Sequence, residues 1–217
     1  MSSHATGARV QRMPRAQRRA QLLGAALTVF VSKGYHAAAM EDIADEAGVS
    51  KPVLYQHFPG KLDLYLALLD NQCDHLETLV LEALNSSEDH EERVYATVRA
   101  FFTFVADEGG AFRLIYESDL TNEPQVRHRI DALEAQLGEA IAQRIIQDTT
   151  LPLELAEMLG LAMSGAAQVM ARTWLAHGSQ FPLEVAAQAA GHLAWRGIGS
   201  FPVNRMGDPA RDHLSAE

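Results

Sequence analysis

The sequence predicts an all-α protein in which an N-terminal head of three helices, with a helix-turn-helix, precedes a C-terminal helical bundle. Apolar residues recur at intervals of three and four, the period of an amphipathic helix, as at Val94, Val98, Phe101 and Val105. Prolines and glycines stand where helices would begin or end. No stretch shows the alternating pattern or turn signal of a β-hairpin. Together these patterns favour helices throughout.

The head is expected over residues 15–60, after a mobile basic arm of residues 1–14. Gly34 is placed to end its first helix, and Gly48 suits a left-handed turn between the second and third. Ser50 can cap the third helix by accepting a hydrogen bond from a free amide, and Pro52 falls in the first turn, where a missing N–H costs little. The three helices are expected at about 15–33, 40–47 and 50–58.

The C-terminal domain is expected over residues 61–203, followed by a flexible polar tail of residues 204–217. Prolines mark the beginnings of its last three helices. One of these helices carries no charge over residues 158–171, so it must be covered nearly all round. Cover on one side by a ligand cavity and on the other by a second subunit would explain it, as would an ordinary core position. The six helices are expected at about 61–84, 94–105, 111–117, 124–145, 152–177 and 182–195.

Charge is distributed unevenly along the chain, whose net charge is −10. Residues 1–62 hold eight basic and four acidic side chains, including all three lysines, whereas the remainder holds 10 basic and 24 acidic ones. A basic head and an acidic body are typical of a protein that faces DNA at one end only. The single cysteine, Cys73, excludes an internal disulfide, and no secretory signal or membrane span is visible, so a cytoplasmic protein is expected.

The third helix carries side chains suited to a DNA major groove. Glutamine can bond adenine in bidentate fashion and an apolar side chain can meet a thymine methyl, while hydroxyl, imidazole and ammonium groups hold phosphates. We therefore expect contacts with double-stranded DNA at a palindromic operator. The expected DNA-binding residues are Arg15, Arg18, Ser50, Lys51, Pro52, Val53, Tyr55, Gln56, His57 and Lys61, with Arg12 and Arg19 as further candidates for the backbone or minor groove.

A hydrophobic effector site is expected in the C-terminal domain. Helical geometry favours an apolar wall made by Phe101, Phe104, Val105, Phe112, Ile115, Met163, Ala167 and Met170. The polar or gating candidates are Tyr116, Gln168, Arg172 and Trp174. For each apolar residue, simple core packing is the competing interpretation.

The head resembles the TetR family of bacterial transcriptional regulators. The family pattern is matched by Lys33-Gly34-Tyr35, Ile43-Ala44, Ala47-Gly48-Val49-Ser50, Leu54-Tyr55, His57-Phe58 and Lys61. The resemblance implies a homodimer whose C-terminal helices bind a ligand and dimerise. Two departures stand out. Ala38-Ala39 replaces the usual Thr or Ser, which predicts the loss of a phosphate contact or helix cap, and Pro52 replaces a usual Gly or Ala.

A narrower resemblance extends into the C-terminal domain. The segments RMPRAQRR, FRLIYESDLTNEPQV and ARTWL, and a late AWRGI followed by FPV, are similar to actinobacterial TetR-type regulators of fatty-acid synthesis. This resemblance implies a long-chain acyl-CoA or similar lipid as the small-molecule effector.

Other functions fit the sequence less well. A TetR-type repressor of an efflux or catabolic gene would bind a different hydrophobic molecule, and an aromatic content of 7% mildly disfavours a pocket for cationic drugs. An enzyme or carrier with a helix-turn-helix-like pair would leave no DNA footprint, and no catalytic motif is visible. Asp70, Cys73 and Asp74 share a helix face, but two hard oxygens with one soft sulfur make a poor metal site. We expect neither enzyme activity nor a bound metal or cofactor.

Overall fold

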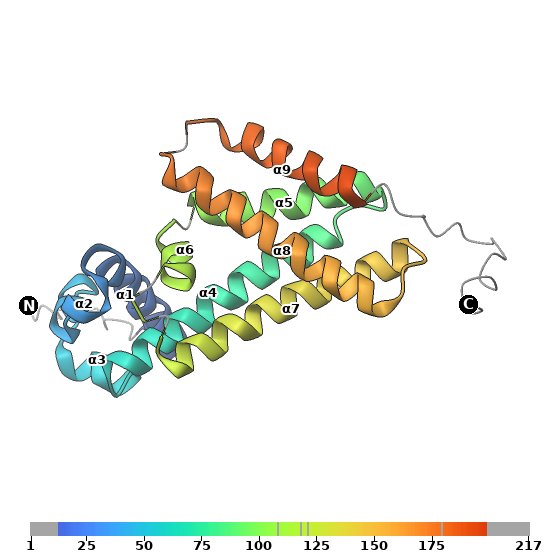
Figure 1. Ribbon diagram of the computed structural model, residues 1–217. Coiled ribbons are helices and arrows are strands. Elements are labelled where there is room, and N and C mark those ends of the chain that lie inside the picture. Colours follow the sequence, from blue (N-terminus) through green and yellow to red (C-terminus); the bar gives the residue numbers. More distant parts are fainter. Residues whose placement is uncertain (1–12, 108, 118, 121, 179, 199–217) are drawn as a thin grey trace, which may run out of the picture. The chain divides into compact units, whose positions relative to one another are not determined.

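The computed structural model describes residues 13–107, 109–117, 119, 120, 122–178 and 180–198. The tail and all but the last two residues of the arm lie outside this range. The described part is α-helical without a β-strand, as predicted (Figure 1). The helices are α1 (Arg15–Ala37), α2 (Met40–Glu46), α3 (Lys51–His57), α4 (Lys61–Leu84), α5 (His90–Asp107), α6 (Gly109–Tyr116), α7 (Pro124–Asp148), α8 (Leu153–Ala176) and α9 (Leu183–Ile198). The chain forms two compact units that divide within α4, after Leu68.

Proline and glycine mark most helix ends as the sequence predicts. Gly34 interrupts α1 with φ 73° and ψ 164°, and one further turn follows it. Pro124 is the first residue of α7, whereas Pro152 is the residue just before α8. The glycine pair at 109–110 differs from expectation because it forms the first turn of α6. Amides in a first turn have no intrahelical partner, so glycine weakens a helix less there.

The core of the first unit joins α1, α2, α3 and the beginning of α4. Leu22, Ile43 and Leu54 are fully buried. An aromatic cluster lies beside them, in which the rings of Phe30, Tyr35 and Tyr65 lie 5.3–5.8 Å apart. The break at Gly34 lies next to this cluster and places Tyr35 against it.

The ammonium of Lys61 closes the end of α1. Its Nζ donates to the backbone oxygens of Tyr35 at 2.8 Å, Ala38 at 2.9 Å and His36 at 3.3 Å. The same Nζ lies 4.5 Å from the centroid of the Tyr35 ring. A single side chain from the start of α4 therefore satisfies carbonyls that the irregular end of α1 leaves without helical partners.

The second unit is a helical bundle in which α8 packs against α7, α5 and α9 (Figure 1). The contact with α7 depends on glycine, because a Cβ built on Gly160 would lie 2.2 Å from the Gly138 oxygen. Small residues of α8 thus allow the close approach of α7. The prediction that α8 is covered nearly all round does not hold within one chain, since Met158, Leu161 and Val169 are each at least half exposed.

We predict that Lys61→Met loosens the end of α1. The variant leaves three backbone oxygens without their charged donor, and hydrogen bonds of this kind contribute about 1–3 kcal/mol. Native-state hydrogen exchange should therefore speed up roughly tenfold or more at the amides around residues 34–38. Lys51→Met is the matched control, because it removes only an exposed ion pair with Glu41. Equal protection of these amides in the wild type and Lys61→Met would contradict the role given to Lys61.

Candidate functional site

The outward face of α3 brings together most of the residues expected to meet DNA. Lys51, Pro52, Tyr55 and Gln56 are exposed, whereas Leu54 and Phe58 on the opposite side are 0% and 2% exposed. The helix is therefore anchored by two apolar side chains and presents one ammonium, one phenol and one amide to solvent. Val53 and His57 are half-buried at the edge of this face.

Ser50 precedes α3 as predicted, but its side chain does not cap the helix. Pro52 has no N–H to donate, and the Val53 N–H donates to the Ser50 carbonyl at 2.9 Å instead of the hydroxyl. The expectation of a Ser50 side-chain cap is thus wrong. The Ser50 hydroxyl is exposed at the start of the helix, where it can serve a phosphate.

The ammonium of Lys61, which is expected to hold a DNA phosphate, also has partners inside the head. Its Nζ donates to three backbone oxygens, which is the full number of donors that an ammonium has. A phosphate contact would require the loss of at least one of these bonds. Lys61 therefore holds the end of α1, and a phosphate contact by this side chain stays a prediction.

The cations near α2 are held by its carboxylates. Lys51 pairs with Glu41, and Lys33 Nζ lies 2.9 Å from Asp42. The hydrogen bond from Lys33 and that from the Ala39 N–H lower the pKa of Asp42. Asp42 thus serves the first turn of α2, while Ala39, lacking a side-chain oxygen, provides no side-chain cap, as predicted.

The arginines of α1 lie close to the end of α3. The Arg19 guanidinium lies 4.6 Å above the Phe58 ring, and Arg18 donates to Gln21, which donates to the Ala47 oxygen. Partial burial, together with the positive charges of Arg15, Arg19 and Arg18, lowers the pKa of His57. These positive charges oppose the protonated form of His57. Arg12 lies outside the described residues.

The second unit contains an apolar cavity between α5, α7, α8 and α9. The room that it offers to a water-sized group is about 70 Å³, and its mouth is open. Of the residues expected to bind the effector, Phe101, Met163 and Ala167 line it. A second hollow on the α9 side shares Val98, Met163 and Ala167 with this cavity and also reaches Met170.

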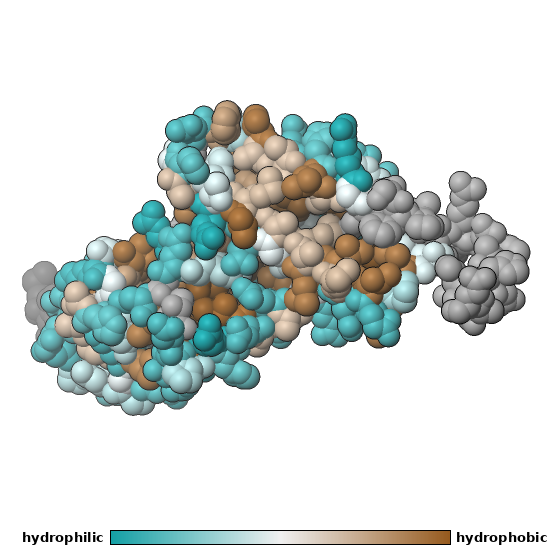
Figure 2. Space-filling view, viewed as in Figure 1, coloured by the Kyte–Doolittle hydropathy of each residue, from teal (hydrophilic) through white to brown (hydrophobic). Residues whose placement is uncertain are grey.

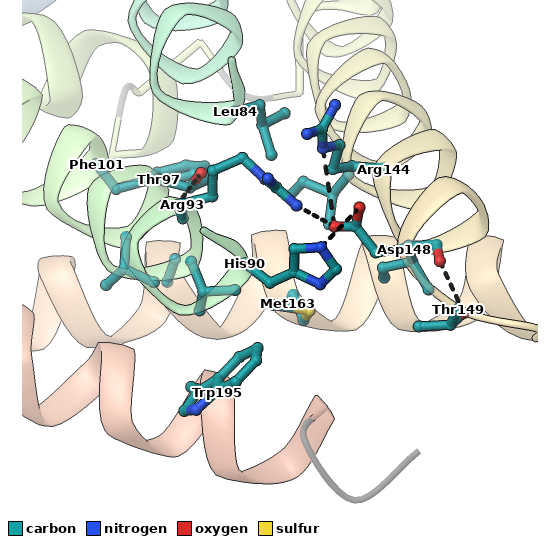
Figure 3. A pocket seen from close by; sticks show the side chains of 15 residues that line it. Leu84, His90, Arg93, Thr97, Phe101, Arg144, Asp148, Thr149, Met163 and Trp195 are labelled. Atoms are coloured by element: carbon teal, nitrogen blue, oxygen red, sulfur yellow. Dashed lines mark hydrogen bonds and ion pairs between the residues drawn. The ribbon is translucent and has the colours of Figure 1, made fainter. Parts of the chain in front are cut away.

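A charged cluster lies at one end of this cavity (Figure 3). Arg93, 2% exposed, donates to the Ser87 oxygen at 2.8 Å and to the Asp148 carboxylate. His90 Nε2 and Arg144 Nε each lie 3.7 Å from an Asp148 oxygen. One carboxylate thus faces two guanidiniums and an imidazole.

Several expected effector residues lie outside this cavity. Phe104, Val105, Phe112 and Ile115 are buried, and none is among the described residues that line it. Burial and the nearby Glu134 raise the pKa of Tyr116, whose ring lies 5.0 Å from that of Phe112. Trp174 and Met170 line a separate groove with Phe102 and Phe181. Gln168 and Arg172 line neither, and Arg172 is exposed.

The residues of the charged cluster are not among those that the sequence predicts for the effector site. Arg93, Arg144 and Asp148 stand on two helices, and no local motif links them. One signal was available, because Arg93 lies beside the apolar face that Val94, Val98 and Phe101 form, and arginine is rarely buried.

A metal or a reactive thiol finds no support in the residues that the structure describes. Burial raises the pKa of the Cys73 thiol to about 12, and Arg129 Nε holds Asp70 at 2.6 Å. Among the described residues, no group of three His, Cys, Asp or Glu side chains is placed to hold a metal. Of the helices described, none is long and apolar enough to span a membrane.

Known proteins resemble this chain first in the head and then over most of its length. Residues 22–68 match the family model described as bacterial regulatory proteins, tetR family. The HTH-type transcriptional activator FasR of Mycolicibacterium smegmatis is 41% identical over 197 residues, which cover 91% of this chain and 90% of FasR.

Solved structures share the complete fold. A TetR-like transcriptional regulator from Rhodococcus sp. RHA1 superposes with a TM-score of 0.71 at 26% identity, covering 87% of this chain and 100% of that one. The regulator FadR from Bacillus subtilis, solved in complex with stearoyl-CoA, gives 0.64 at 18% identity, covering 81% and 96%, and shows the fold alone. The chain belongs to the TetR family of bacterial transcriptional regulators.

Proposed function

We propose that this regulator binds a palindromic operator as a homodimer. We further propose that a long-chain acyl-CoA in the cavity of the second unit controls its operator affinity, and thereby the genes of lipid or fatty-acid synthesis. The observation that carries the proposal is an apolar cavity with charge gathered at one end, which matches an apolar chain with a polar head. The extended similarity to FasR and the fold shared with a stearoyl-CoA complex support it.

The outward face of α3 supports sequence-specific DNA binding. Gln56 is exposed next to Tyr55 and one turn from Pro52, so its amide can reach a base edge. Lys51 and Tyr55 flank it and suit the phosphates on either side. Because FasR is a transcriptional activator, we propose that operator binding by this chain raises transcription.

The outward faces of α8 and α9 support dimerisation. Large apolar side chains on these helices are about half exposed or more, and Figure 2 shows the hydrophobic surface that they form. Patches of this kind rarely stay open on a soluble monomer. The exposed set includes Met158, Leu161, Val169, Val185 and Leu193. A second copy offers the same surface, as a two-fold dimer requires.

Ligand control requires that the acyl-CoA has different affinities for two arrangements of the dimer. Half-sites in successive major grooves fix the spacing of the two heads that DNA accepts. A ligand that prefers another arrangement lowers operator affinity by the ratio of its two affinities, and by no more.

We predict that Gln56→Ala and Lys51→Ala weaken DNA binding in different ways. The operator is first selected from random duplexes, and affinity is then measured at several salt concentrations. Gln56→Ala should lose about 1–3 kcal/mol on the operator and little on random DNA. Lys51→Ala should weaken both and lower the salt slope by about one. Specificity that is unchanged in Gln56→Ala would contradict the proposed base contact.

We predict that filling the cavity abolishes the effect of the ligand on operator affinity. Ala167, 6% exposed, lines the cavity, so Ala167→Leu should occupy the path of an acyl chain. Stearoyl-CoA should change wild-type operator affinity roughly 5- to 150-fold and the affinity of Ala167→Leu less than about twofold. The control is Ala132→Leu, the same change on an exposed position of α7. An equal change of operator affinity in the wild type and Ala167→Leu would show that the effector binds elsewhere. If stearoyl-CoA does not change the operator affinity of the wild type, acyl-CoA is not the effector.

We predict that Leu161→Lys separates the dimer. Leu161 is 52% exposed in one chain, and an unpaired ammonium in a dry interface costs several kcal/mol. Mass photometry should show a dimer for the wild type and a monomer for Leu161→Lys. Leu81→Lys is the control, because Leu81 is an exposed leucine of α4. A dimer that survives Leu161→Lys would exclude this face of α8.

A further inference from the structure

The charged end of the cavity holds more positive than negative groups. Arg93 and Arg144 face the carboxylate of Asp148, and Asp148 is the single acidic side chain among the described residues that line the cavity. His90 adds positive charge when protonated. An apolar cavity that ends in an excess of cationic donors suits a ligand that brings an oxygen acceptor on an apolar chain.

Most donors at this end already have partners. Arg93 donates to Ser87 and Asp148, so it joins the start of α5 to the end of α7. The Thr97 hydroxyl donates to the Arg93 oxygen and that of Thr149 to the Ile145 oxygen, at 2.8 and 2.7 Å. These contacts hold the wall of the cavity together and fix the Arg93 guanidinium in place.

Arg144 is different. Its Nη1 donates to Gln147 at 3.1 Å, but its Nε is buried and has no hydrogen-bond partner among the described residues. Its distance of 3.7 Å to the Asp148 Oδ2, which accepts from Arg93, is too long for a hydrogen bond. A buried N–H without an acceptor is unfavourable, and an entering oxygen would remove this penalty.

We propose that Arg144 donates its Nε–H to the carbonyl oxygen of the bound acyl group and so distinguishes acyl compounds from other long-chain amphiphiles. This inference rests on the proposed function, because it takes the acyl chain to lie in this cavity. The chain would lie against Val98, Phe101 and Met163, and its first carbon would lie at the charged end. A carbonyl desolvated there needs a donor, and a guanidinium supplies a charge-assisted one.

An acyl-CoA and a free fatty acid both carry an oxygen acceptor at the first carbon of the chain. Three probes distinguish these two classes of ligand. Stearoyl-CoA carries a thioester carbonyl, stearate carries a carboxylate, and S-octadecyl-CoA is a thioether that keeps the chain and the CoA but lacks the oxygen. Binding of each to the full-length protein is measured by calorimetry below its micellar concentration. Quenching of the fluorescence of Trp195, which lines the cavity, gives a second measure of binding.

The wild type should bind stearoyl-CoA roughly tenfold more tightly than S-octadecyl-CoA. Arg144→Met removes the donor at similar length and should bind both CoA compounds equally, with the weaker affinity. Arg127→Met is the matched control, because Arg127 is exposed on the same helix, and it should keep the tenfold preference. Thermal unfolding of each variant checks that the fold is intact.

Equal wild-type affinity for the thioester and the thioether would overturn the role of Arg144 while the acyl-CoA function stands. A preference that survives in Arg144→Met would overturn it as well. If only stearate binds, and Arg144→Met weakens it, the oxygen is read from a free fatty acid and the CoA ester is excluded. If no probe binds, both the inference and the proposed effector fail. The comparison of ligands in the wild type remains decisive even where a variant unfolds.

Discussion

The contact between the Lys61 ammonium and the carbonyls of Tyr35, His36 and Ala38 determines the geometry of the DNA-binding head. Gly34 breaks α1 and leaves backbone oxygens without helical partners, and Lys61 at the start of α4 supplies the missing donors. Since α2 follows directly after Ala38, this contact fixes where the helix-turn-helix begins relative to α4. The exposed face of α3 is oriented by a bond that lies outside α3.

This arrangement explains the most conspicuous residues of the head motif. Lys33, Tyr35 and Lys61 serve the fold, through Asp42, the aromatic cluster and the end of α1. Gln56, Tyr55 and Ser50 are left exposed. A positive side chain near DNA is therefore not by itself a phosphate contact, because an irregular helix end attracts cations for its own reasons.

The helices could be predicted from the sequence because their signals are local. Periodicity, Gly34, Gly48 and Pro124 each act within a few residues, and the structure has a helix or a break at each. The charged cluster could not be predicted, since Asp148 meets an arginine 55 positions away. Nor does periodicity tell which buried side chains face a void. Phe101 and Phe104 are equally buried, yet only Phe101 is among the residues lining the cavity.

We propose that the cavity of the second unit holds the acyl chain of the effector. Photocrosslinking tests it most directly, with a stearoyl-CoA analogue that carries a diazirine at the chain end. The intact regulator is labelled and then digested, and the modified peptides are identified by mass spectrometry. We expect labelling at cavity residues of α5 and α8, such as Val98 and Met163, and suppression of this labelling by unmodified stearoyl-CoA. Specific labelling confined to the separate groove around Trp174 and Phe181, or to the first unit, would contradict it.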